Sequence, residues 1–144
     1  MRIRAGGILI EDNKLALIER HRAERHYFSF PGGGVDKGET YEQAVVRELH
    51  EELGLHVQVI RRIAEISLRG KMQYYFLVEK IAGVFGTGTG EEYDGYDPDY
   101  GTYTPLWLPI VELPHHNVLP PQLSQLVYHS LANGWPAETV IIPE

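Results

Sequence analysis

The segment from Gly33 to Leu55 constrains this chain more than any other, because it joins a glycine-rich turn to a short acidic helix. Thr40 is a favourable N-cap residue, and Gln43 three positions later completes a capping box. Gly54 stands where a left-handed residue commonly ends a helix. The spacing therefore predicts a helix over residues 41–53.

This helix is expected to be apolar on one side and acidic on the neighbouring side. Four apolar side chains share one stripe, which should pack on a sheet: Val45, Val46, Leu49 and Leu53. Glu48, Glu51 and Glu52 lie beside that stripe, within an arc of about 100°. Like charges three or four positions apart cost a few tenths of a kcal/mol per pair. We therefore expect a positive partner, and oxygen ligands favour Mg²⁺ or Mn²⁺ over zinc.

The glycine turn and the helix together resemble a known signature. Every defining position of the Nudix hydrolase signature is filled at the right spacing: Gly33, Glu39, Arg47, Glu48, Leu49, Glu51, Glu52, Gly54 and Leu55. The match covers about a sixth of the chain. The resemblance implies an α/β protein, an α/β/α sandwich with a mixed central sheet. It also implies a metal-dependent pyrophosphohydrolase that cleaves the diphosphate linkage of a nucleoside diphosphate derivative.

The expected metal site uses oxygen atoms. Glu51 and Glu52 are the expected primary ligands, and Glu48 is either a further ligand or the base that takes a proton from water. In the family a backbone carbonyl at the glycine turn also contacts metal, which implicates Gly32. Family members also use an acidic residue from a loop comparable to residues 84–101, so Glu91 or Glu92 is a further candidate.

Three more groups of residues are candidates for the site. Arg47 is expected to pair with Glu39 or to hold Glu48 by a charge-assisted hydrogen bond, although a purely structural ion pair between Arg47 and Glu39 is the alternative. Arginines before the turn are expected to bind substrate phosphates, unless they are ordinary surface residues: Arg20, Arg22 and Arg25. Trp107 either stacks on a base or belongs to the core.

Composition bounds the class of protein. A chain of 144 residues with 43% hydrophobic content suits a single domain, residues 1–144. It contains no cysteine, no apolar run near 18 residues and no long apolar leader, so we expect a cytoplasmic protein without membrane association. A net charge of −7 disfavours stable nucleic-acid binding, although a metal ion would let the chain bind a small phosphate ester.

The remaining pattern predicts strands and a second helix. The expected strands are residues 3–10, 14–19, 56–68, 72–81 and 102–108, and the second helix is 122–132. Residues 21–29 are predicted to be a polar link. Residues 84–101 hold five glycines and five acids and are predicted to form a long loop, either a substrate lid or a solvated excursion. Residues 139–142 can pair with a second copy of the chain, giving a homodimer, or close their own sheet edge.

The signature predicts the reaction better than the substrate. Our first choice is a nucleoside triphosphate, oxidised or normal, cleaved to the monophosphate and pyrophosphate. Diadenosine polyphosphates are the runner-up, because Tyr74 and Tyr75 lie close to where the hydrolases of these compounds carry a tyrosine. ADP-ribose or nucleotide sugars are further alternatives. A domain that binds nucleotides without hydrolysis, acting as a sensor, is the alternative of another class. Retention of Glu48, Glu51 and Glu52 disfavours it.

Overall fold

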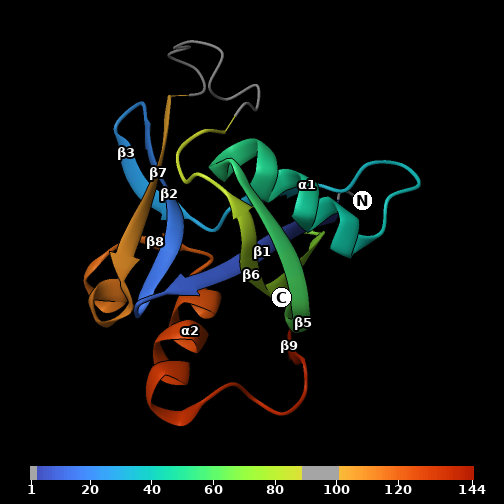
Figure 1. The fold of residues 1–144 in the computed structure, drawn as a ribbon. Helices are drawn as coiled ribbons and strands as arrows, with labels where there is room; N and C mark the ends of the chain where they lie inside the picture. Colours follow the sequence, from blue (N-terminus) through green and yellow to red (C-terminus); the bar gives the residue numbers. More distant parts are fainter. Residues whose placement is uncertain (1–2, 89–100) are drawn as a thin grey trace.

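The computed structural model describes residues 3–88 and 101–144, which form a mixed β-sheet with two α-helices (Figure 1). The strands are β1 (Ile3–Glu11), β2 (Lys14–Arg22), β3 (Arg25–Ser29), β4 (Gly32–Gly34), β5 (Leu55–Leu68), β6 (Lys71–Gly83), β7 (Thr102–Pro109), β8 (Val118–Leu119) and β9 (Val140–Ile142). The helices are α1 (Tyr41–Leu53), α2 (Pro121–Asn133) and the short 3₁₀ helix η2 (Ile110–His115). This arrangement confirms the predicted α/β class.

Strand β1 joins the two halves of the sheet. It pairs in parallel with β6 over residues 3–9, and its last two residues pair antiparallel with β2. The strand order is β8-β3-β2-β1-β6-β5-β9, with β7 on β2 and β4 on β1. The pairing with β4 sets Arg4 opposite Gly34 and Gly6 opposite Gly32. The glycine turn is therefore anchored beside the start of β1.

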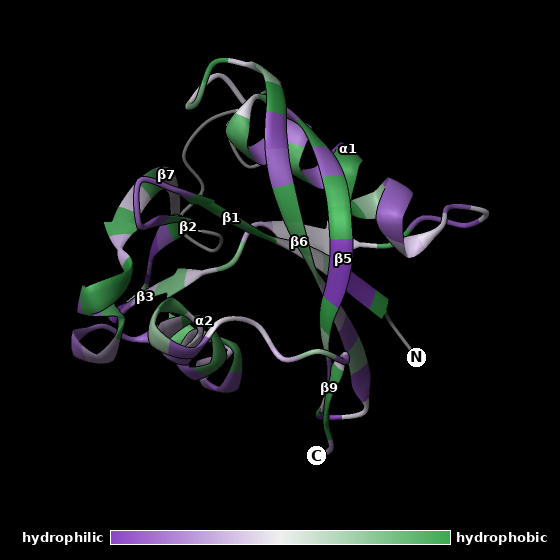
Figure 2. Cartoon of the chain, turned by 60° about the horizontal axis from the view of Figure 1, so that its bottom comes forward, coloured by the Kyte–Doolittle hydropathy of each residue, from purple (hydrophilic) through white to green (hydrophobic). Residues whose placement is uncertain are grey.

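Each α-helix covers its own apolar cluster. Helix α1 contributes Leu49 and Leu53 to a cluster with β1, β5 and β6, and both side chains are fully buried. Helix α2 contributes Leu123 and Val127 to the second cluster. Burying a side chain of this size stabilises the fold by about 1.5–3 kcal/mol. Hydrophobic and hydrophilic bands alternate along β5 in Figure 2, as expected for a strand with one buried face.

The caps of α1 agree with the prediction from sequence. The Thr40 hydroxyl accepts a hydrogen bond from the Gln43 amide at 3.0 Å, and the Gln43 side chain accepts one from the Thr40 amide at 2.9 Å. Gly54 ends the helix with a φ of 78°. Since both signals are local, the helix bounds of 41–53 could be predicted without knowledge of the sheet.

The prediction of a link at residues 21–29 was wrong. Strand β2 continues to Arg22, and β3 begins at Arg25 after a two-residue turn in which Ala23 takes a φ of 55°. Short hairpin turns usually carry Asn-Gly or Asp-Gly, and the Ala-Glu pair here lacks that signal. Residues 140–142 pair in parallel with β5, so this segment closes its own sheet edge.

No helix in the described part of the chain has both the length and the apolar character needed to cross a lipid bilayer.

Candidate active site

The buried end of the acidic helix face lies against the glycine turn. The backbone amide of Gly32 donates a hydrogen bond of 2.8 Å to Oε2 of Glu52. Glu52 is only 8% exposed, which is unusual for a glutamate. The turn therefore holds this carboxylate in place, next to the predicted backbone ligand Gly32.

Gly33 accommodates the carboxylate of Glu48. A Cβ atom added at Gly33 would lie 2.5 Å from the Cδ atom of Glu48, closer than side chains normally approach. Burial raises the pKa of Glu48, and hydrogen bonding from Arg47 only partly offsets that rise. A carboxylate whose pKa is raised is a better proton acceptor, so the environment of Glu48 suits a base.

Arg47 connects the acidic residues. Its Nε donates to Glu39 at 2.8 Å, and its Nη1 donates to Glu48 at 2.8 Å and to Glu51 at 3.3 Å. Its Nη2 also donates to the carbonyl of Gly34 at 2.9 Å. Arg47 thus makes both of the contacts considered from the sequence. Its guanidinium supplies part of the positive charge that the acidic helix face requires.

The three helix carboxylates do not close on a single point. Glu48 and Glu51 turn to Arg47, whereas Glu52 turns to Gly32. The donor set nonetheless fits a hard divalent cation, because it consists of carboxylate and carbonyl oxygens beside a turn without side chains.

The pairing of Glu39 with Arg47 predicts a pH-dependent contribution to stability. The hydrogen bond from Arg47 lowers the pKa of Glu39 below its ordinary value of 4.5. The contribution is therefore fully present above pH 4.5 and is lost as the pH falls through the lowered value. We expect Glu39→Gln to lower the free energy of unfolding at pH 7 by about 1 kcal/mol, measured by urea denaturation. The difference should shrink below pH 4.5.

Asp36 provides the matched control. Its carboxylate lies 3.5 Å from the same guanidinium but is 72% exposed, whereas Glu39 is 15% exposed. Asp36→Asn should change stability little, because solvent screens exposed ion pairs. Equal losses in the two variants, or a loss in Glu39→Gln that does not depend on pH, would contradict the assignment.

Two adjoining cavities share Arg4 and Gln73 in their linings, and one of the two is lined by the glycine turn. One, of about 540 Å³, is lined by Gly33 and Gly34, the arginines Arg4 and Arg22, and Lys71, Gln73 and Tyr103. The other, of about 530 Å³, also contains Arg4 and Gln73, and it adds Arg20, Arg25 and Tyr27 to its lining. The three arginines predicted to bind phosphate thus all line this pair of cavities, together with aromatic rings.

The aromatic rings hold two of these arginines in place. The guanidinium of Arg20 lies 3.6 Å from the ring centroid of Tyr103, and its Nε donates to the carbonyl of Thr102 at 3.0 Å. The guanidinium of Arg25 lies 4.8 Å from the ring centroid of Tyr27. These cation–π contacts fix the positive charges along the cavity wall.

Arg4 was not identified from the sequence. It lies where the two cavities meet, and its Nη2 donates to the carbonyl of Phe30 at 3.1 Å. Burial alone would lower the pKa of Arg4, but the nearby Tyr75 and Glu52 raise it overall, so the guanidinium stays charged. A single arginine in a short apolar strand carries no local signal. Only the pairing of β1 with β4 and β6 reveals its position.

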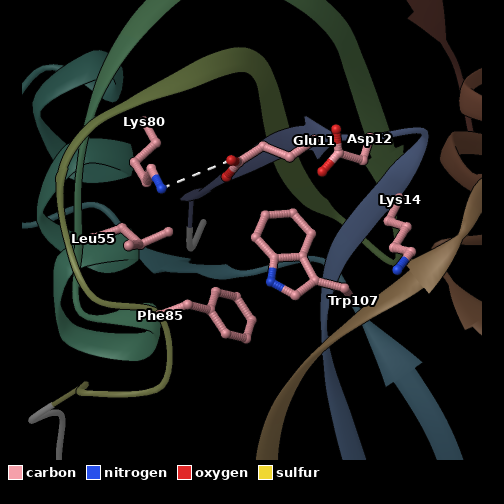
Figure 3. A pocket seen from close by; sticks show the side chains of 7 residues that line it. All are labelled: Glu11, Asp12, Lys14, Leu55, Lys80, Phe85 and Trp107. Carbon is pink, nitrogen blue, oxygen red and sulfur yellow. Dashed lines mark ion pairs between the residues drawn. The ribbon is translucent and has the colours of Figure 1, made fainter.

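Trp107 belongs to a different part of the molecule. It packs against the apolar cluster of α1, and its ring centroid lies 4.8 Å from that of Phe85. Both rings line a smaller cavity of about 220 Å³, shown in Figure 3, with Leu55 and an ion pair of 3.7 Å between Lys80 and Glu11. The core interpretation of Trp107 therefore agrees with its packing.

Glu92, like Glu91, lies outside the described residues.

Comparison with protein families and curated proteins gives consistent results. A family model described as the NUDIX domain matches residues 1–126. An 8-oxo-dGTP diphosphatase of Escherichia coli (strain K12) is 43% identical over 75 residues, which are 50% of this chain and 54% of that protein. An RNA pyrophosphohydrolase of Pseudoalteromonas translucida (strain TAC 125) is 45% identical over 58 residues, which are 40% of this chain and 34% of that protein. The chain thus spans about a third to about a half of these curated relatives.

Solved structures show the same fold. The crystal structure of a NUDIX hydrolase from Nitrosomonas europaea superposes with a TM-score of 0.75 and 20% identity, over 99% of this chain and 79% of that one.

Proposed function

This chain belongs to the NUDIX domain family, and from that premise we propose that it is a cytoplasmic, divalent-metal-dependent hydrolase of nucleoside diphosphate derivatives. The observation that carries the proposal is the placement of Glu48 and Glu52 against the glycine turn, which also lines an arginine-rich cavity. Carboxylates and guanidinium groups are thereby brought to the same turn. A diphosphate bridged to a cation requires both kinds of group.

We assign the residues as follows. Gly32, Glu51 and Glu52 would hold Mg²⁺, with Mn²⁺ as the alternative, and Glu92 remains a candidate ligand. When bound, the cation would lower the pKa of a coordinated water and neutralise charge on the diphosphate. Glu48 is either a further ligand or the base that accepts the proton of the attacking water.

The remaining charged residues position these groups and the substrate. Arg47 orients Glu48 through its hydrogen bond of 2.8 Å, and Glu39 in turn holds Arg47. Arg4 and Arg22 lie on the cavity wall beside the turn, where they would bind phosphate oxygens by charge-assisted hydrogen bonds. This division of roles lets the helix act on the scissile bond while the strands hold the substrate.

Our first choice of substrate is a nucleoside triphosphate, oxidised or normal, cleaved to the monophosphate and pyrophosphate. The relative named 8-oxo-dGTP diphosphatase supports this choice. ADP-ribose, nucleotide sugars and diadenosine polyphosphates remain alternatives.

A product-release assay across a substrate panel tests this proposal. The panel contains oxidised and normal nucleoside triphosphates, ADP-ribose, a nucleotide sugar, diadenosine polyphosphates and an RNA with a 5′-triphosphate. We expect a nucleoside triphosphate to give the highest kcat/KM, with pyrophosphate as product, and we expect EDTA to abolish the reaction. Arg4→Met should lower kcat/KM for every cleaved substrate, because the phosphates are common to all.

Arg61→Met on β5 is the matched control, since Arg61 lines neither of these two cavities. Preference for ADP-ribose or a diadenosine polyphosphate would replace the substrate assignment. Tight nucleotide binding that needs no metal and yields no product would contradict the hydrolase assignment and favour a sensor domain.

A further inference from the structure

A cluster of two histidines and a glutamate lies on the hairpin of β2 and β3. His21 and His26 are direct partners across the two strands, and their rings stack with centroids 4.2 Å apart and planes at 2°. Glu19 precedes His21 by two residues, so its side chain lies on the same face of β2. The cluster is separate from the acidic helix face, because it uses neither α1 nor the glycine turn.

One carboxylate oxygen of Glu19 faces the Nε2 atoms of both stacked imidazoles. Oε2 of Glu19 is 2.8 Å from Nε2 of His26 and 3.6 Å from Nε2 of His21. Among residues 3–88 and 101–144, these three form the only group of three or more potential metal ligands whose donor atoms all lie within 4.8 Å of one another. The sequence alone did not indicate a metal site here. The ligands come from β2 and β3, and β3 was not predicted.

The spacing is close to that of a bound metal ion. Zinc binds nitrogen and oxygen at about 2.0–2.2 Å in tetrahedral sites, which places neighbouring ligand atoms about 3.3–3.5 Å apart. The donor atoms therefore need shifts on the order of 1 Å, together with rotation of the rings out of their parallel stack. The side chains of His21 and His26 are 57% and 50% exposed, so packing does not oppose that rotation.

The donor chemistry selects the class of metal. Imidazole nitrogen suits zinc, nickel and copper, whereas Mg²⁺ prefers sites made of oxygen alone. We propose that Glu19, His21 and His26 form a second metal site, which takes a borderline divalent ion of the zinc class and leaves a coordination position open to water.

The site would act on the hairpin that carries the substrate cavity. Side chains alternate along a strand, so Arg20 lies on the opposite face from Glu19 and His21. Arg20 lines the cavity of about 530 Å³ from β2, and Arg25 and Tyr27 line it from β3. A metal ion held by both strands would fix the hairpin from outside and restrain these residues on the inside.

Calorimetric titration of the full chain with Zn²⁺, in excess Mg²⁺, tests the site. We expect one Zn²⁺ ion per chain to bind at the hairpin. Loss of a residue that only supports a metal ligand typically weakens metal binding by about 10–100-fold. Loss of a ligand itself should cost at least as much, so we expect His21→Ala and His26→Ala each to reduce the affinity for Zn²⁺ by about 10–100-fold or more. His56→Ala is the matched control, because His50 and His56 also stack, with centroids 4.4 Å apart, but belong to no such three-ligand group among the described residues.

Two further measurements keep the result unambiguous. Circular dichroism shows whether the variants fold, and nuclear magnetic resonance of the histidine rings reports on the unaltered chain. We expect Zn²⁺ to shift the ring signals of His21 and His26 and to leave those of His50 and His56 in place. Any of three results would overturn the proposal. The first is that the signals of His21 and His26 do not shift, and the second is an equal loss of affinity in His56→Ala. The third is zinc binding that disappears in Glu52→Gln but persists in His26→Ala.

Discussion

Replacing Glu52 with glutamine should lower kcat by about 10³-fold while the fold persists. Glutamine keeps the length of the side chain and an oxygen that can still accept the 2.8 Å hydrogen bond from Gly32. It removes the negative charge that would hold the divalent cation. A bound cation supplies several kcal/mol of transition-state stabilisation, and each step of about 1.4 kcal/mol corresponds to tenfold in rate.

The measurement is steady-state hydrolysis at saturating Mg²⁺, with circular dichroism as the check on folding. Glu42→Gln is the matched control, because Glu42 lies on the same helix but is exposed on its first turn. We expect that variant to retain nearly full activity. A folded Glu52→Gln variant with unchanged kcat would exclude Glu52 as a ligand and with it the proposed metal site.

The second large effect is expected for Gly33→Ala, a change of one methyl group. The added Cβ would lie 2.5–2.6 Å from the carboxylate atoms of Glu48, so that side chain must move. Its hydrogen bond with Arg47 would then be lost. Displacing a reacting group by about 1 Å can cost on the order of 10² in rate. We therefore expect kcat to fall about 100-fold. Stability should fall by only about 1 kcal/mol, the loss expected for the hydrogen bond with Arg47, because the added methyl group collides with a side chain that can move aside.

Gly32→Ala provides a contrast at the neighbouring position. A Cβ there would lie 2.4 Å from the carbonyl oxygen of Ala5, which is backbone and cannot move aside. The φ of 155° at Gly32 adds strain. This variant should be destabilised by about 2–3 kcal/mol, as measured by urea denaturation.

A double variant separates the two explanations for lost activity in Gly33→Ala. Glu48→Asp shortens the colliding side chain, so it should cost less in the Gly33→Ala background than in the unaltered chain. Additive losses would show that Gly33 acts on activity through something other than Glu48.

The comparison of sequence and structure is clearest in α1. Its first and last residues follow from Thr40, Gln43 and Gly54, and its buried stripe follows from the spacing of apolar residues. The contacts of Arg47 could also be anticipated in part. Glu48 and Glu51 are close to it along the helix, and Glu39 lies just before the N-cap.

The hairpin of β2 and β3 shows where sequence reasoning fails. Residues 21–29 are largely polar and turn through Ala23, so nothing local indicates a strand. Antiparallel pairing with β7 contributes to the structure of this part of β2, because Thr102 and Tyr103 stand opposite His21 and Arg20. A partner about 80 residues away leaves no trace in a local pattern.

The chain's own sequence determined the acidic helix, its caps and the family signature, because hydrogen bonding and side-chain periodicity within a helix involve residues at most four positions apart. The register of the sheet determined the rest. It brought Arg4 opposite Gly34, placed Arg20 against Tyr103, and set His21 beside His26. Such contacts join residues from separate strands, so they exist only once long-range packing has selected which strands are neighbours and how they align.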